Sequence, residues 1–383
     1  MLKLQATLLL LLCVPGEGRL EEHRGGGAVA FSPDGRRLLS HGSEGFHVWD
    51  LAEGRELDLE KAVTAPRIDA ERQAAFTRDG KEVVLFDSGR LHTWTLETGA
   101  RVRLLRGPEA FLGGSLLSPE GAVFAAYEAE AKALVKLTFH ASAREESRAV
   151  DIPEGEINSM AFSPLGDRFA ASGGRGREGW VRVWETSGRE RGVLRIQPPG
   201  ASRSVIAKAP SGAFSPDGKL LVVTRTAGTH IPGRPGGASL LQVWDVESGQ
   251  EHAALEGHQG EVWQVAFAPD GARLAAWGPS ELILWSLEQK KPLLIRAGVV
   301  HAAAFDAAGA ALAVIASADP LKHQERTVSV LDLASGRDRF VLPTAYYHAA
   351  VFSPDGARLA VSSDRSIRLL DALTGEPLKP GGK

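Results

Sequence analysis

One six-residue stretch of the chain has the spacing of a nucleotide-binding loop. Gly174, Gly176 and Gly179 follow the Gly-x-Gly-x-x-Gly pattern, in which backbone N–H groups approach a pyrophosphate. That chemistry requires a helix to begin directly after the glycines, because its N-terminus must face the phosphate. Here the stretch leads into Trp180-Val-Arg-Val-Trp184, whose β-branched and aromatic residues favour a strand. We therefore interpret these glycines as a loop between strands and predict no cofactor.

Other residue patterns that carry enzyme chemistry do not occur in the sequence. There is no phosphate loop ending in Gly-Lys-Ser/Thr, no His-Glu-x-x-His and no Gly-x-Ser-x-Gly. The single cysteine, Cys13, excludes an intrachain disulfide and a cysteine-based zinc site. We predict no catalytic residue, no metal ligand and no enzymatic activity. Four histidines that fall near repeat starts or outer strands are interpreted as structural: His252, His258, His301 and His348.

Basic side chains are concentrated in four segments, at residues 172–180, 197–212, 226–239 and 317–327. In and at the edge of these segments stand eight positive and three negative side chains, whereas the whole chain carries a net charge of −3. Such a local excess of positive charge favours an acidic partner. The candidate partner-binding residues are Arg175, Arg177, Trp180, Arg203, Lys208, Arg225, His230, Arg234, Lys322, His323 and Arg326.

The elements that must position these side chains are set by an internal repeat. The phrase Phe-Ser-Pro-Asp-Gly, intact or altered, occurs eight times, and successive copies start 38 to 53 residues apart. A period of this length indicates an array of similar structural units, and the binding surface of such an array is expected where the units differ. The copies begin at Phe31, Phe76, Leu117, Phe162, Phe214, Phe267, Phe305 and Phe352.

Each repeat is predicted to form four short antiparallel strands. In the first repeat, Pro33 presets φ and Gly35 accepts a positive φ, so the Pro-Asp-Gly step is a tight turn. The alternating Phe46-His-Val-Trp49 favours a strand. The strands of this repeat are expected near residues 28–32, 38–40, 46–49 and 55–59.

The second half of the repeat resembles the WD-repeat family of β-propellers. The resemblance rests on Trp49-Asp50, Trp244-Asp245 and Gly257-His258, and it extends over roughly residues 19–380. It implies four-stranded blades around a channel and a non-catalytic role in protein binding. Many members of that family hold a buried His, Asp, Ser/Thr and Trp in one hydrogen-bonded set. Here only Gly257-His258 with Trp285 keeps the His and the Trp together, so apolar packing is expected to hold the other blades.

We predict an all-β fold made of a single β-propeller over residues 19–383, with eight four-stranded blades and seven as the alternative. The units at 117–150 and 305–342 are the least regular. Residues 19–23 and 376–379 both stand where an outermost strand belongs, so the sequence leaves the closure of the ring open. The composition is ordinary for a globular protein and gives no indication of nucleic-acid binding. A monomeric propeller is expected.

Residues 1–18 have the pattern of a secretory signal peptide. Lys3 precedes a leucine-rich run at 6–14, and Gly16 and Gly18 are small enough for cleavage after Gly18. The run is too short to cross a bilayer as a stable helix. We therefore expect a periplasmic or extracellular protein, and the style of its repeats resembles bacterial chains. The alternatives left open are a propeller strand in a cytoplasmic protein and a lipid-modified Cys13.

The predicted meander places the variable segments on one side of the molecule. Successive turns of antiparallel strands alternate between the two ends of a sheet. With the strands labelled a to d from the centre outward, the Ser-Pro-Asp-Gly turns (a–b) and the c–d turns share one face. The b–c and d–a connections, including the four basic segments, share the other. We predict that this second face binds an acidic protein or peptide, with Trp180 as an exposed anchor.

Two further functions remain as alternatives. One is an exported propeller that binds carbohydrate or cell-envelope components. Against it, the tryptophans recur inside strand c, where they are expected to pack in the blade core. The other is a propeller enzyme, either a hydrolase or a quinoprotein. Eight-bladed quinoproteins carry a tryptophan after the glycine of their blade motif, whereas Trp244 here precedes Asp245 and Gly249.

Overall fold

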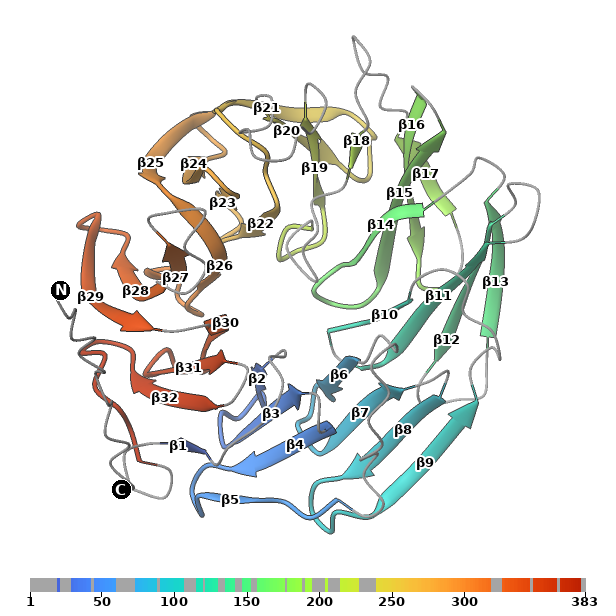
Figure 1. The fold of residues 1–383 in the computed structure, drawn as a ribbon. Coiled ribbons are helices and arrows are strands. Elements are labelled where there is room, and N and C mark those ends of the chain that lie inside the picture. The colour runs from blue at the N-terminus through green and yellow to red at the C-terminus, as the bar shows by residue number, and fades with distance from the viewer. Residues whose placement is uncertain are drawn as a thin grey trace, which may run out of the picture.

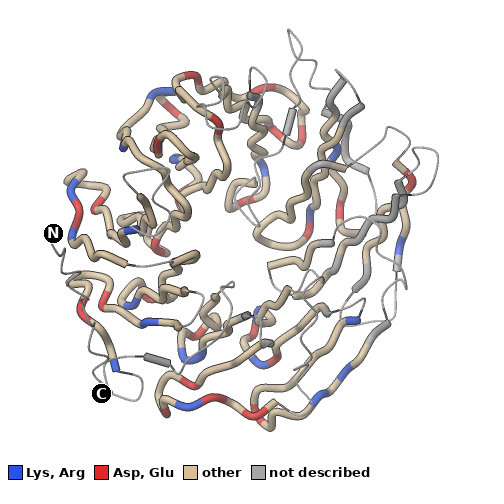
Figure 2. Tube along the Cα trace, viewed as in Figure 1, with Lys and Arg blue, Asp and Glu red and all other residues tan. Residues whose placement is uncertain are grey.

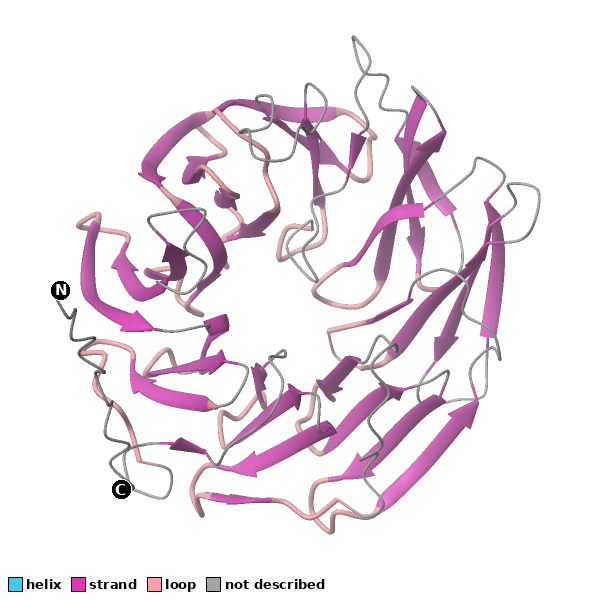
Figure 3. Ribbon diagram, viewed as in Figure 1, coloured by secondary structure: helices cyan, strands magenta, loops and turns pink. Residues whose placement is uncertain are grey.

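Short β-strands joined by turns make up the described part of the protein, which contains no helix (Figure 3). The computed structural model describes residues 19–20, 29–42, 45–59, 73–87, 90–106, 115–119, 121–129, 135–141, 147–152, 157–175, 178–187, 190–194, 204–205, 214–226, 239–317, 326–344, 347–363 and 366–379. Within these residues the strands form eight four-stranded sheets, which stand as blades in a ring (Figure 1). The all-β propeller predicted from the repeats is thereby confirmed.

Seven blades each take four consecutive strands, paired antiparallel in sequence order. Blades 1 to 3 comprise β2 (Val29–Phe31), β3 (Arg37–Gly42), β4 (Gly45–Asp50) and β5 (Arg55–Glu56); β6 (Gln73–Phe76), β7 (Glu82–Asp87), β8 (Arg90–Thr95) and β9 (Arg101–Arg106); and β10 (Ser115–Leu117), β11 (Val123–Ala129), β12 (Val135–Ala141) and β13 (Ser147–Ile152). Blades 4 and 5 comprise β14 (Ile157–Phe162), β15 (Arg168–Arg175), β16 (Glu178–Glu185) and β17 (Glu190–Leu194); and β18 (Ser204–Val205), β19 (Leu220–Thr226), β20 (Ser239–Asp245) and β21 (Glu251–His258).

Blades 6 and 7 continue the same order. They comprise β22 (Gln264–Phe267), β23 (Arg273–Trp277), β24 (Glu281–Ser286) and β25 (Lys291–Ala297); and β26 (Val299–Phe305), β27 (Ala311–Ser317), β28 (Arg326–Asp332) and β29 (Arg337–Thr344). The units described as the least regular, at 117–150 and 305–342, form complete four-stranded sheets as blades 3 and 7, although the register shifts at two places in blade 7. Their strands keep the apolar residues that pack between blades, even though the turn phrase has changed.

The eighth blade closes the ring with both ends of the described chain. Its inner strands are β30 (Tyr347–Phe352), β31 (Arg358–Ser363) and β32 (Ile367–Asp371), and β1 (Arg19–Leu20) pairs with the outer edge of β32. Pro377 forms a bridge to Leu370 further along the same edge. Figure 1 shows β1 beside β32 at the periphery. The sequence could not decide which of the two candidate segments closes the ring, and in the structure both lie at the outermost position.

The hydrophobic core lies between the blades, because a four-stranded sheet exposes two apolar faces that only its neighbours can cover. Eight clusters of buried side chains occur, one at each junction of adjacent blades. At the closing junction, Leu38 and Trp49 of blade 1 pack with Ala360, Ile367 and Leu369 of blade 8. Every blade is thus stabilised by both neighbours, and the ring presents two faces formed by the ends of the strands.

Candidate interaction face

The connections at the two ends of the strands differ in how much their lengths vary. In seven blades five residues intervene between strand a and strand b, from 32–36 in blade 1 to 353–357 in blade 8, and in blade 5 the same number separates the bridge residue Phe214 from β19. At the other end, the b–c connections range from two residues, at 43–44, to twelve, at 227–238. We call the side of the a–b turns the turn face and the opposite side the long-loop face.

One hydrogen-bonding scheme repeats around the turn face. In blade 1 the Ser32 hydroxyl donates to the Asp34 carboxylate at 2.6 Å and accepts the Arg37 N–H at 2.9 Å. Gly35 has φ of +69°, a conformation that a residue with a Cβ adopts only with strain. Equivalent oxygens accept the N–H five residues further on at Thr77, Ser118, Ser163, Ser215, Asp306 and Ser353. The polar residues of the repeated phrase therefore serve their own turns.

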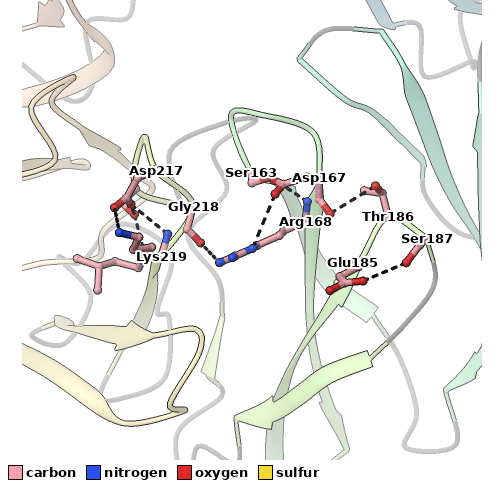
Figure 4. A network of polar contacts seen from close by, with 11 residues as sticks. Ser163, Asp167, Arg168, Glu185, Thr186, Ser187, Asp217, Gly218 and Lys219 are labelled. Carbon is pink, nitrogen blue, oxygen red and sulfur yellow. Dashed lines mark hydrogen bonds and ion pairs between the residues drawn. The ribbon is translucent and has the colours of Figure 1, made fainter.

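Arginines on the turn face also join neighbouring blades. Arg168 of blade 4 donates from Nη1 to the carbonyl of Gly218 in blade 5 at 2.7 Å, as Figure 4 shows. Arg273 reaches Gly309 in the same way at 2.6 Å. Arg358 of blade 8 reaches Gly35 of blade 1 at 2.6 Å. Each arginine stands two residues after its own turn glycine, so the sequence encodes these links wherever Arg occupies that position.

The carboxylates of the turns are engaged within the fold. The Ser353 hydroxyl and the Ala357 N–H hold the pKa of Asp355 below its usual range. In a c–d turn, the N–H and hydroxyl of Ser335, followed by Arg339, lower the pKa of Asp332 to about 2. Figure 2 shows Lys and Arg interspersed with Asp and Glu around the described ring. The turn face therefore carries charges of both signs that hydrogen-bond to neighbouring groups in the turns.

Most of the predicted binding residues lie outside the described part of the chain. Among them, Arg175 stands in β15 opposite Glu178, Arg225 stands in β19 opposite Leu240, and Arg326 begins β28. Strand a of blade 5 begins at Ser204, inside the segment predicted as one long connection. The predicted residues that the structure does not describe are Arg177, Arg203, Lys208, His230, Arg234, Lys322 and His323.

The prediction of an exposed Trp180 is wrong. Residues 172–180 were expected to form an enlarged b–c loop, but β15 continues to Arg175 and β16 begins at Glu178. Trp180 consequently pairs with Gly173 inside the sheet, and its side chain is only 6% exposed within the cluster between blades 3 and 4. The glycines provide no bulk on the strand opposite, which leaves room for the indole to pack against blade 3. Trp180 cannot anchor a partner from this position.

Four other side chains come to the long-loop face at blades 6 to 8. Trp263, directly before β22, is 39% exposed and is the only exposed one of the eight tryptophans. His301 in β26 lies with Nε2 3.1 Å from the Ser317 hydroxyl. Arg326 donates from Nη1 to the Tyr347 carbonyl at 2.6 Å and lies 3.4 Å from Nδ1 of His348. Sequence reasoning missed three of these, although each stands four residues before the phenylalanine of its repeat.

The junction of blades 5 and 6 shows how the long-loop face is stabilised when its connection is short. His258 is buried, and Nδ1 lies 3.5 Å from Oε1 of Glu281, which accepts the Gln259 N–H at 2.6 Å. Burial lowers the pKa of His258 to about 4, so this imidazole is neutral at pH 7. The Trp285 ring centroid is 6.1 Å from that of His258. The expected pairing of His258 with Trp285 is therefore a packing contact.

Metal chemistry has no visible site in the described segments. Within them, no three His, Cys, Asp or Glu side chains lie close enough together to hold a metal ion. Among the same residues, no helix is both long and apolar enough to span a membrane.

Part of the chain matches a known repeat family. Three segments match the WD domain, G-beta repeat. The matched WD repeats cover residues 150–185, 249–280 and 345–371. The first two segments begin in or just before the outermost strand of one blade and end in or just before strand c of the next, so each spans parts of two adjacent blades. The third segment covers β30, β31 and β32 of blade 8, whose outermost strand is β1.

Several curated proteins are similar to parts of the chain. Protein hir-1 of Neurospora crassa is 24% identical over 239 residues, or 54% of this chain and 23% of hir-1. The probable cytosolic iron-sulfur protein assembly protein 1 of Pyricularia oryzae is 29% identical over 151 residues, or 36% of this chain and 32% of that protein. WD repeat-containing protein SL1-17 of Schistosoma mansoni is 27% identical over 148 residues, or 37% of this chain and 47% of that protein.

The similarity to these relatives concerns the WD repeats and not a whole protein. The matched part is less than half of each relative's own length. The relatives come from eukaryotes, so the comparisons give no support to the predicted bacterial source. WD repeats and relatives of this kind are typical of non-catalytic interaction scaffolds that bind other proteins. Neither the relatives nor the described residues show an enzymatic activity.

Proposed function

We propose that this propeller is a non-catalytic scaffold that binds a partner protein on its long-loop face. The observation that carries the proposal is the contrast between the two faces. Five-residue turns with one hydrogen-bonding scheme repeat on the turn face, while the connections on the other face vary from two to twelve residues in the b–c class. Rigid blades hold these variable connections, and variable loops on a rigid frame are where repeat proteins commonly bind.

The strand register allows a sharp test of this face. Thr226 pairs with Ser239, and Ser317 pairs with Arg326, so each pair of strand ends is already close enough for a two-residue turn. Asn-Gly in place of residues 227–238 and of residues 318–325 should therefore preserve blades 5 and 7. The intact and the trimmed proteins would each be crosslinked in extracts of the native source, and the captured proteins compared.

The control carries a single charge reversal on the turn face. Arg36 is exposed there, and Arg36→Glu reverses a charge without altering a connection. The proposal expects one partner to be captured by the intact protein and by Arg36→Glu, and to be lost with the trimmed protein. Equal capture by the intact and trimmed proteins, with unchanged thermal stability, would move the binding site away from the long-loop face.

We also propose that the protein is exported after cleavage behind Gly18. The support is the signal-like composition of residues 1–18 together with the position of β1, which begins at Arg19. Cleavage there leaves in place the described pairing of Arg19 and Leu20 with β32. Mass spectrometry of the protein from its native source tests the proposal. A chain that begins at Arg19 supports it, and an intact N-terminus in an intracellular fraction overturns it.

A further inference from the structure

Three consecutive blades carry a ring side chain at the same place on the long-loop face. Trp263 of blade 6, His301 of blade 7 and His348 of blade 8 each stand four residues before the phenylalanine that opens the turn of their repeat. Trp263 directly precedes the innermost strand β22, and His301 and His348 lie within the first three residues of the innermost strands β26 and β30. The innermost strands of blades 6, 7 and 8 contact one another in order. The three side chains therefore follow the inner rim of the face across adjacent blades.

Irregularities of the strands set two of these side chains apart from the regular alternation. The pairing of β26 with β27 shifts register between Val300 and Ala302, and that of β30 with β31 shifts between Tyr347 and Ala349. His301 and His348 are the extra residues at these bulges. A bulge changes the direction of a side chain that would otherwise alternate into the sheet. Here it follows that neither imidazole belongs to the apolar layers between blades.

Hydrogen bonds hold these groups in position before any partner arrives. His301 is 3.1 Å from the Ser317 hydroxyl at the end of β27. Arg326 crosses from blade 7 to blade 8, where Nη1 donates to the Tyr347 carbonyl at 2.6 Å. That contact fixes the guanidinium beside His348, whose Nδ1 is 3.4 Å away. Groups that are already ordered lose less conformational freedom on binding, so such a cluster is suited to recognition.

The chemistry of the cluster is cationic and aromatic. Arg326 is charged at any physiological pH, and imidazole N–H groups donate hydrogen bonds to carboxylates. Trp263, with 39% of its surface exposed, offers an indole at the equivalent position of the neighbouring blade 6. The carboxylates near Trp263 are Glu261 and Glu281, and Glu281 is buried with its oxygen accepting the Gln259 N–H. Tryptophan and arginine are the residues most often found at the energetic centre of protein interfaces.

We propose that Trp263, His301, Arg326 and His348, the blade 6–8 patch, bind an acidic peptide segment of the partner. The segment would place a carboxylate against Arg326 and His348 and an apolar side chain against Trp263. The inference rests on the proposed scaffold function and deepens it, because it assigns the contact to one sector of the long-loop face and gives the partner segment its charge. The described rim residues supply the contact without the longer connections at 227–238 and 318–325.

The test uses immobilised short synthetic peptides of random order, rich in Asp and Glu and containing Leu and Phe. Matched peptides carry Asn and Gln in place of Asp and Glu. Capture of the full-length protein is compared with capture of Trp263→Ala, His348→Glu and Arg326→Lys. Arg36→Glu, on the turn face, is the matched charge-reversal control. Thermal melting and circular dichroism establish that each variant keeps its fold. Lysine is chosen at position 326 because it keeps the positive charge, whereas alanine would remove both the charge and the hydrogen bond to the Tyr347 carbonyl of blade 8.

The patch is supported if the wild type and Arg36→Glu select the acidic peptides over the neutral ones, and if Trp263→Ala and His348→Glu each weaken capture by about tenfold, or 1.4 kcal/mol. Equal capture of acidic and neutral peptides, or full capture by folded patch variants, overturns it. These outcomes are separate from the scaffold test. If the partner crosslinks to the intact protein but not to the loop-trimmed one, while patch variants bind normally, the scaffold function stands and the patch is rejected.

Discussion

The two faces of this propeller are made from the same strands, yet they use their residues in opposite ways. On the turn face, Ser32 and Ser353 perform the same task 321 positions apart, because each closes the turn that follows it. On the long-loop face, the position four residues before the phenylalanine of the repeat holds Trp263, His301 and His348, which share no common hydrogen bond among the described residues. Repetition in this protein therefore marks structural work, and divergence at equivalent positions marks the surface free to acquire a specific partner.

The largest expected effect separates a blade-core tryptophan from the one on the long-loop face. Trp285 is 1% exposed between blades 5 and 6, so Trp285→Ala should lower the free energy of unfolding by about 3–5 kcal/mol. Trp263→Ala removes the same side chain from a partly solvated site and should cost less than about 1 kcal/mol. Urea unfolding monitored by circular dichroism measures both. If Trp263→Ala is as destabilising as Trp285→Ala, Trp263 is structural and the comparison of faces fails at this position.

Protonation of the buried His258 should make the stability of the protein depend on pH. Its folded pKa is about 4, below the 6.5 of an ordinary histidine, so between these values the unfolded chain binds the proton more readily. The stability it contributes is complete above pH 6.5 and falls as the pH decreases toward 4, by up to about 3 kcal/mol. Unfolding of the wild type and of His258→Gln across this pH range should show a shallower dependence in the variant. His252→Gln, at an exposed position of β21, should behave as the wild type. Equal slopes for the wild type and His258→Gln would contradict the assignment.

A smaller effect is expected where the turn face demands glycine. Gly309 has φ of +66°, and a Cβ there would lie 3.0 Å from Nη2 of Arg273. Gly309→Ala should therefore destabilise the protein by about 1–2 kcal/mol, since the left-handed conformation is strained for alanine. Gly309→Asn should cost less, because asparagine tolerates this conformation better than alanine does. Melting temperatures of the two variants give the comparison, and a harmless alanine would show that the turn relaxes.

The smallest expected change in stability comes from the arginine that joins blades 4 and 5, which can be compared with a surface ion pair formed by the two residues that flank Gly218. Arg168 donates to the Gly218 carbonyl across the blade junction, so Arg168→Ala should cost about 1 kcal/mol. Lys219 forms an exposed pair with Asp217 at 3.7 Å, and Lys219→Ala should change stability by a few tenths of a kcal/mol at most. Both residues appear in Figure 4. Equal losses in denaturant unfolding would mean that the inter-blade hydrogen bond contributes nothing particular to the ring.

The fold could be predicted because the repeated phrase satisfies itself locally. Where the phrase is intact, its Ser, Asp and Gly hydrogen-bond within six residues, so their spacing carries the geometry of the turn directly into the sequence. Blades 3 and 7 were expected to be irregular because their turn phrases are altered. They nevertheless form complete four-stranded blades because buried strand residues such as Leu137 and Val314 supply the packing. Turn chemistry is thus sufficient to locate a blade, and its loss is not sufficient to exclude one.

The candidate site was predicted less well, because it depends on contacts between distant segments. Arg326 was identified from its charge alone, while its position beside His348 depends on how blade 7 meets blade 8. Gly174, Gly176 and Gly179 suggested a loop, yet Gly174 and Gly179 pair with each other where β15 meets β16, and the neighbouring pair is Gly173 with Trp180. The bulges at His301 and His348 leave no signature in a single sequence. The shared offset of four residues was the available signal, and it becomes meaningful once the inner strands are known to adjoin.

The order in which the chain is made gives the ring closure a consequence for folding. Arg358 of blade 8 hydrogen-bonds to Gly35 of blade 1, which lies 323 residues earlier in the chain. At the periphery of blade 8, β1 pairs with β32, which is also distant in sequence. During synthesis, β1 and the face of blade 1 that packs against blade 8 have no partner until blade 8 has left the ribosome. The entropy of closing so long a loop grows only slowly with length, so the delay is kinetic more than thermodynamic. A nascent propeller must keep these edges soluble, and a chain truncated before blade 8 would expose two apolar blade faces to aggregation.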